Sequence, residues 1–138
     1  MKKDSKGHYT NLASEFYVLA MLNRKQCNAY LTLGRQKSVD IVIVKGRKHI
    51  TVDVKGTRVG EWLMGNKKPM KKKHHYFALV NYVNKFESPH IPPEVYLIRS
   101  IELDKFLTHG GKGYGVYYPR MRDEGKKYLN NWNAFLEI

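Results

Sequence analysis

Residues 38–55 read SVDIVIVKGRKHITVDVK, two runs rich in Val and Ile on either side of a glycine-containing turn. β-branched residues that alternate with other side chains are typical of strands, and a short turn with a glycine is typical of a hairpin. We therefore expect strands over residues 38–45 and 49–55. Apolar residues occur on both faces of the first strand, which indicates a sheet covered on both sides.

The length of this turn predicts which residues face one another. If Gly46 and the residue after it form a two-residue tip, Lys45 pairs with Lys48, and counting back places Asp40 opposite Asp53. Like charges directly opposite each other destabilise a sheet. Lys55 shares a face with Asp53 and supplies one compensating charge. A divalent cation would supply the rest, and Mg²⁺ prefers carboxylate oxygens, water and phosphate.

The N-terminal region contributes a third candidate carboxylate. Residues 11–26 are expected to form a helix because apolar residues recur at helical spacing, namely Leu12, Phe16, Leu19 and Leu22. Glu15 then lies on or beside the apolar face. Buried charges are usually paired or bound to metal, so Glu15 is a candidate for the same site.

The rest of the chain predicts a mixed sheet flanked by helices, an α/β fold in one domain over residues 1–138. Further strands are expected near residues 29–33, 75–83 and 94–100, and helices at 101–108 and 123–136. Residues 56–74 are expected to be irregular, and residues 109–115 to form a glycine-rich loop.

The net charge points to a polyanionic partner. The 138 residues include 25 Lys and Arg against 12 Asp and Glu, a formal charge of +13. Such an excess causes self-repulsion in a folded chain, and nucleic acid is the usual reason for it. A membrane is the less suitable partner, because no stretch predicts a helix with one basic and one wide apolar face.

Cysteine content and apolar runs indicate the cellular setting. The single Cys27 excludes an internal disulfide and a cysteine zinc site. The first ten residues contain no apolar stretch typical of a secretory signal, and the longest apolar run, residues 16–22, is too short to span a bilayer. We expect a soluble cytoplasmic protein.

A lysine-dense segment follows the third predicted strand. It contains Lys67, Lys68, Lys71, Lys72 and Lys73. One interpretation is a mobile loop that contacts phosphates, and the plainer one is a solvated loop. Given the overall charge, we favour phosphate contacts, which would make binding strongly salt-dependent.

Two other motifs give weaker indications of function. The glycines of residues 110–115 are not followed by the Lys-Ser/Thr of a phosphate-binding loop and precede a strand-like stretch rather than a helix. His74 and His75 are not expected to form a metal pair, because adjacent residues of a strand face opposite sides.

The chain from Glu15 to Lys55 resembles the PD-(D/E)xK nuclease superfamily, which includes restriction endonucleases, archaeal Holliday-junction resolvases and repair nucleases. Glu15 matches the glutamate of the family's first helix, Asp40 the aspartate that opens the second strand, and Asp53-Val54-Lys55 the acid-x-lysine of the third strand. Val39 stands where the family name has proline, and Asp53 replaces the commoner glutamate. Gly60, Gly65 and Pro69 argue against the long helix that usually follows.

The resemblance implies Mg²⁺-dependent hydrolysis of DNA phosphodiesters, with Mn²⁺ able to substitute. Asp40, Asp53 and the carbonyl of Val54 are implied to bind the metal, and Glu15 to help directly or through water. Lys55 would orient the attacking water or stabilise developing negative charge. We expect duplex or branched DNA as partner, and a homodimer stays open.

Each site residue also has a plainer explanation. Asp53 and Lys55 are compatible with an exposed ion pair, Asp40 with a strand start, and Glu15 with a first-turn acid favoured by the helix dipole.

Two other functions stay open at this point. One is a non-catalytic nucleic-acid-binding module on a nuclease-like fold, and the other is a structural or interaction subunit with that fold.

Overall fold

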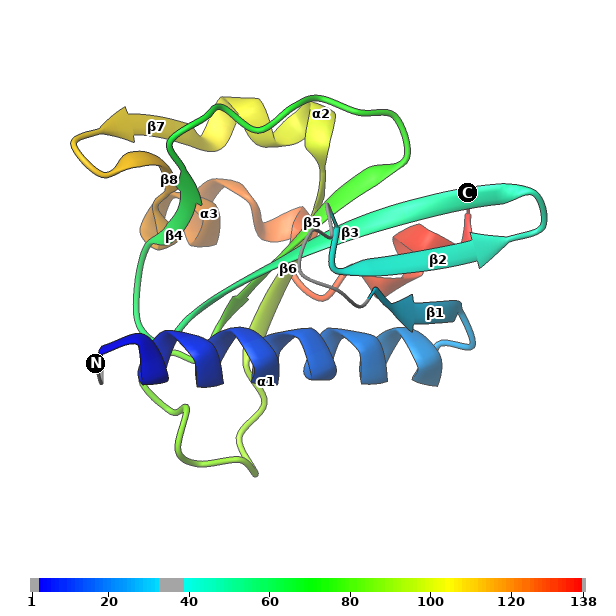
Figure 1. Cartoon of the computed structure of the whole chain (residues 1–138), viewed down its shortest axis with the longest axis horizontal. Coiled ribbons are helices and arrows are strands. Elements are labelled where there is room, and N and C mark those ends of the chain that lie inside the picture. Colours follow the sequence, from blue (N-terminus) through cyan, green and yellow to red (C-terminus); the bar gives the residue numbers. More distant parts are fainter. Residues whose placement is uncertain (1–2, 33–38, 138) are drawn as a thin grey trace.

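The computed structural model describes residues 3–32 and 39–137 (Figure 1). Their order is α1 (Lys3–Arg24), β1 (Asn28–Leu31), β2 (Ile41–Lys45), β3 (Lys48–Thr57), β4 (Trp62–Gly65), β5 (His75–Asn81), β6 (Glu94–Arg99), α2 (Ser100–Leu103), β7 (Leu107–Gly110), β8 (Gly113–Val116) and α3 (Tyr118–Glu124). Short 3₁₀ helices cover Asp104–Phe106, Lys126–Tyr128 and Trp132–Leu136. Two ends of predicted strands, Leu33 and Ser38, lie outside the described residues.

A five-stranded mixed sheet in the order β1-β2-β3-β5-β6 forms the centre of the molecule. β3 and β5 are parallel, and the other neighbours are antiparallel. A second, three-stranded sheet has the order β4-β8-β7. The mixed sheet confirms the predicted α/β class. In the described part of the chain, no helix is long and apolar enough to cross a membrane.

The β2–β3 hairpin has the register that the turn length predicts. Lys45 pairs with Lys48, and pairing continues to Ile41 and Val52. Gly46 occupies the tip with a positive φ of 63°, a conformation that glycine adopts at little cost. Asp40 lies one residue beyond the last paired position, next to the end of this ladder.

The central sheet separates two apolar cores. On one face, α1 packs over Ile50, Val52 and Val54 of β3 and Ala78 and Val80 of β5. On the other face, Phe77 and Leu79 of β5 pack with Trp62 and Met64 of β4, Val116 of β8 and Met121 of α3. Figure 1 shows α1 on one side of the sheet, with the second sheet, α2 and α3 on the other. Both faces are therefore covered, as the apolar pattern predicts.

Helix α1 faces the sheet with residues that match the prediction only at Leu22. It begins at Lys3 rather than near Asn11, and its buried positions are Thr10, Ser14, Val18 and Leu22. The predicted core residues Leu12 and Phe16 are 41% and 52% exposed. The reason is close packing: a Cβ at Gly56 of β3 would lie 3.1 Å from Ser14 Cβ and 3.2 Å from the Thr10 carbonyl oxygen. Only small side chains fit against β3 there.

The segment after β3 and the C-terminal segment also differ from the prediction. β3 extends through Thr57, residues 62–65 form β4, and the glycine-rich stretch is the turn of the β7–β8 hairpin. The C-terminal segment is three short helical pieces rather than one helix over residues 123–136. Tyr128 packs in one core, whereas Trp132 and Phe135 pack in the other. The chain turns between them at Asn130, where φ is 54°.

Candidate active site

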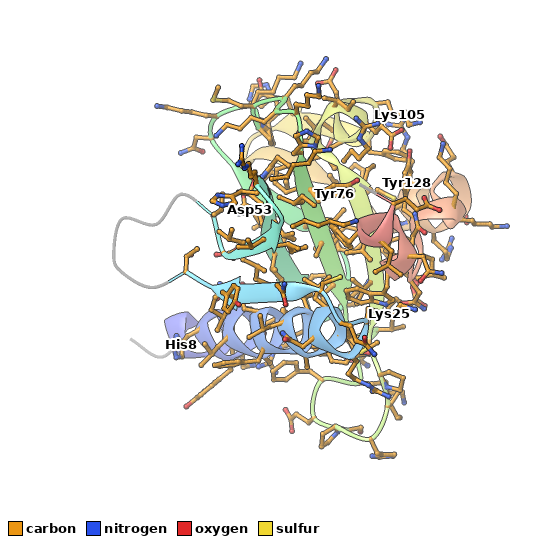
Figure 2. The ribbon with its side chains drawn as sticks, turned by 90° about the vertical axis from the view of Figure 1, so that its right-hand side faces the viewer. His8, Lys25, Asp53, Tyr76, Lys105 and Tyr128 are labelled. Atoms are coloured by element: carbon orange, nitrogen blue, oxygen red, sulfur yellow. The ribbon has the colours of Figure 1, made fainter. Side chains whose placement is uncertain are left out.

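Asp53 and Lys55 lie side by side on β3, on the face of the sheet that does not carry α1. The parallel register places Asp53 beside Phe77 and Lys55 beside Leu79, which belong to the second core. Both residues are half-buried, and the Asp53 side chain is 25% exposed. Figure 2 shows Asp53 on the opposite side of the β2–β3 hairpin from α1. The predicted pair therefore points the same way and reaches solvent.

These two side chains line a pocket of about 220 Å³. β3 and β5 form its floor, and β4 and the lysine-dense segment form its walls. Its lining consists of Val39, Asp53, Lys55, Met64, Pro69, Met70, Lys72, His75 and Phe77. The pocket thus brings one carboxylate, two amines and one imidazole together over an apolar base.

Asp40 supports the end of β2. Its carboxylate oxygen Oδ2 accepts a hydrogen bond from the backbone N–H of Val54 at 2.8 Å. Its own N–H donates to the Val52 carbonyl at 3.2 Å, and its carbonyl accepts from Thr32 N–H at 3.0 Å. Asp40 is therefore bound to β1 and β3 together, with its carboxylate turned toward the residue between Asp53 and Lys55.

His75, the first residue of β5, belongs to this site and was missed by the sequence analysis. Its Nε2 lies 3.3 Å from Asp53 Oδ2, and its Nδ1 lies 2.6 Å from Thr51 Oγ1. The side chain is only 6% exposed. His74, with a positive φ of 60°, precedes the strand and is not among the residues that line the pocket. The signal that places His75 here is the parallel β3–β5 register, which pairs it with Thr51.

Glu15 lies half-buried on α1, the helix that covers the opposite face of the sheet. It is not among the residues that line the pocket with Asp53 and Lys55. Its participation stays a prediction that rests on the family resemblance.

The lysine-dense segment borders the pocket, and its five lysines are all exposed. Lys72 lines the pocket directly. Lys68 and Lys71 lie 2.8 Å and 3.5 Å from the two carboxylate oxygens of Asp104. The hydrogen bond from Lys68 lowers the pKa of Asp104, and the same bond raises the pKa of Lys68. Two of the five charges are thus partly neutralised.

The side chains of the pocket can be compared with the ligands that Mg²⁺ requires. Among residues 3–32 and 39–137, no three Asp, Glu, His or Cys side chains form a ready metal cluster. However, Mg²⁺ keeps several waters and is commonly held by one or two carboxylates together with substrate phosphates. Asp53 provides one such carboxylate, whereas Asp40, next to the same end of the hairpin, is not among the residues that line the pocket. The residues therefore fit a cation that completes its coordination with water or with a substrate phosphate.

The mixed sheet, with α1 on one face and the second sheet on the other, forms an α/β core. No protein-family model matches the sequence, and no curated protein matches it. Among solved structures, the chain is similar to that of a bacterial homing endonuclease, I-Ssp6803I, with a TM-score of 0.57 and 14% sequence identity. The match covers 93% of this chain and 89% of that chain. At this identity, the similarity concerns the fold.

Proposed function

We propose that this protein is a divalent-metal-dependent endonuclease of the PD-(D/E)xK type that hydrolyses DNA phosphodiester bonds. The observation that carries the proposal is the pocket in which Asp53 and Lys55 stand side by side with Lys72 at the rim. A carboxylate for a cation and amines for a phosphate are the groups that phosphodiester hydrolysis needs. The fold shared with a homing endonuclease supports the same reaction class.

DNA is the proposed substrate because the protein carries a large positive charge. The formal net charge is +13, and the lysine-dense segment lies directly beside the pocket. Lysines that contact phosphates displace condensed counterions, which drives binding without reading sequence. The charge therefore supports a polyanionic backbone as ligand, and base specificity would come from other contacts.

Each site residue has a proposed role. Asp53 would hold Mg²⁺ from within the pocket. Asp40, the Val54 carbonyl and Glu15, directly or through water, are the further ligands that the family resemblance implies. When bound, the ion supplies a water of lowered pKa next to the phosphate. Lys55 would orient that water or stabilise the negative charge that develops on the phosphate. Lys72, at the rim, would position the DNA backbone. Asp40, through its bond to Val54 N–H, also keeps the end of β2 beside the acid-x-lysine segment.

The second candidate function is a DNA-binding module without catalysis. The observation in its favour is that the described residues hold no ready cluster of three metal-binding side chains. This candidate shares the basic surface but assigns Asp53 and Lys55 to a structural ion pair. It therefore predicts that Mg²⁺ is not required for DNA binding.

A cleavage assay with purified protein separates the two candidates. Duplex, single-stranded and branched DNA would be incubated with Mg²⁺, with Mn²⁺ or with EDTA. We expect cleavage of at least one substrate, and only with metal. Lys55→Ala should abolish it, whereas Lys48→Ala, at the exposed start of the same strand, should leave it unchanged. Binding without cleavage of any substrate would support the module.

A further inference from the structure

The ring of His75 lies between two residues of β3. Its Nδ1 is 2.6 Å from the Thr51 hydroxyl, and its Nε2 is 3.3 Å from Asp53 Oδ2. The ring also packs edge-on against Phe77, with centroids 5.1 Å apart. A buried imidazole with a contact at each nitrogen has a fixed orientation, and His75 lines the pocket together with Asp53 and Lys55.

The contact at Nδ1 bears on which nitrogen carries the proton. The Thr51 hydroxyl can donate to Nδ1 while Nε2–H donates to the Asp53 carboxylate, or it can accept from Nδ1–H, which leaves the Nε2 lone pair on the Asp53 side. A cation between Nε2 and Asp53 Oδ2 requires the second tautomer, because both atoms then supply an electron pair to the ion. A neutral imidazole whose second nitrogen is held by a neighbouring oxygen is the usual arrangement of a metal-binding histidine.

The distance between His75 Nε2 and Asp53 Oδ2 is also suitable for two ligands of one metal ion. Two atoms each about 2.1 Å from one ion, at tetrahedral or octahedral angles, lie about 3.0–3.4 Å apart. The Nε2 to Oδ2 distance of 3.3 Å falls in this interval. The buried side chains of Met64 and Phe77 line the same pocket, and apolar side chains next to a metal site tune its dielectric surroundings.

We propose that His75 is a nitrogen ligand of the metal centre, paired with the oxygen ligand Asp53. A centre with an imidazole ligand binds first-row transition ions, such as Mn²⁺, Co²⁺ or Zn²⁺, more tightly than Mg²⁺. Mg²⁺ would still support the reaction at higher concentration. This inference rests on the proposed function and specifies the cation that the site selects.

The direct test is pulsed electron paramagnetic resonance of Mn²⁺ bound to the protein, after removal of any affinity tag. We expect hyperfine coupling to a ¹⁴N nucleus in the wild type. His75→Leu should lose this coupling, and His49→Leu, which changes an exposed histidine of β3, should keep it. Mn²⁺ bound to the wild type without nitrogen coupling would overturn the proposal, and so would a failure of Mn²⁺ to bind.

Calorimetric titration gives a second, independent readout. We expect Mn²⁺ to bind the wild type at least about tenfold more tightly than Mg²⁺, and His75→Leu to reduce mainly the Mn²⁺ affinity, by about 10–100-fold. If His75→Leu unfolds, His75→Gln decides the question, because it keeps a polar side chain at this position and removes the imidazole nitrogen. Unchanged metal selectivity in the folded variant would mean that His75 only positions Asp53 and would overturn the proposal.

These measurements use neither DNA nor turnover, so they separate this proposal from the nuclease proposal. Metal-dependent cleavage without nitrogen coupling would overturn the role of His75 and leave the nuclease intact. Nitrogen coupling in a protein that cleaves no DNA would support the metal site and overturn the nuclease.

Discussion

The hydroxyl group of Ser100 binds both backbone polar groups of Lys72. It accepts a hydrogen bond from the Lys72 N–H at 2.9 Å and donates one to the Lys72 carbonyl at 2.7 Å. Ser100 is buried at the start of α2. The segment that the sequence analysis predicts to be mobile is thus attached to the sheet's edge at Lys72, the lysine that lines the pocket. Its position makes it a direct candidate for phosphate contact.

The first prediction concerns the salt dependence of DNA binding. Log affinity should fall with log salt concentration with a slope of about −0.9 per phosphate contacted. Replacing Lys71, Lys72 and Lys73 with Ala should flatten this slope, because three charges at the pocket rim are lost. Lys72→Ala should account for more of the change than Lys71→Ala, since Lys71 is already paired with Asp104. Fluorescence anisotropy of labelled DNA over a series of salt concentrations measures the slope for each variant.

A matched triple variant controls for net charge. Lys105, Lys126 and Lys127 belong to the part of the surface around Tyr128, which Figure 2 shows well apart from Asp53. Their replacement with Ala removes the same total charge. If this control flattens the slope as much as the rim variant does, the phosphate contacts do not lie at the pocket.

The second prediction concerns Asp104, which holds Lys68 and Lys71. Asp104→Asn should release both lysines, so DNA should bind more tightly and with a steeper salt slope. Because the hydrogen bond from Lys68 lowers the pKa of Asp104, this carboxylate stays ionised to lower pH than an ordinary aspartate. The ratio of variant to wild-type affinity should therefore be the same at about pH 5 and at neutral pH. Asp123→Asn, whose partner is Arg122, should leave affinity unchanged.

The third prediction concerns the contact between α1 and β3. Gly56→Ala should reduce the free energy of unfolding by about 1–3 kcal/mol, because the new methyl group would press on Ser14 and on the Thr10 carbonyl. Gly60→Ala should have little effect, since a Cβ there meets no atom within 4 Å. Urea denaturation of the two variants measures the difference. Equal stability of both would show that α1 can move away from the sheet without cost.

The fourth prediction concerns metal binding and stability together. Wild type should gain stability on adding Mg²⁺, by about 2.7 kcal/mol at a concentration 100 times Kd, because the ion binds the folded chain. Asp53→Asn should gain little. Without metal, the variant should melt at the same temperature as wild type or slightly higher, since one of the two carboxylates at this end of the hairpin becomes neutral. A variant that melts clearly lower, with no metal effect on either protein, would indicate a structural Asp53.

The parts of the structure that were predicted correctly depend on local sequence. The β2–β3 register follows from a two-residue turn, and the shared face of Asp53 and Lys55 follows from their spacing within one strand. These features need no knowledge of the rest of the chain. The mixed sheet flanked by helices could also be predicted, because a run of strand signals lies between helix signals at the two ends of the sequence.

The parts that were not predicted depend on contacts between distant segments. His75 meets Asp53 only because β5 pairs in parallel with β3 in one particular register. The buried face of α1 is set by the closeness of Ser14 to Gly56, which hydrophobic spacing within the helix does not reveal. The C-terminal segment breaks into pieces because Tyr128 and Phe135 enter different cores.

The central claim is that Asp53 belongs to a metal-dependent site that cuts DNA, and the most direct measurement is the rate at which supercoiled plasmid is nicked. Wild type, Asp53→Asn and the control Asp123→Asn would be compared in Mg²⁺, in Mn²⁺ and in EDTA. We predict nicking by wild type and by the control, only with metal, and a loss of at least about a hundredfold in Asp53→Asn. Equal rates for wild type and Asp53→Asn, or nicking that persists in EDTA, would contradict the account.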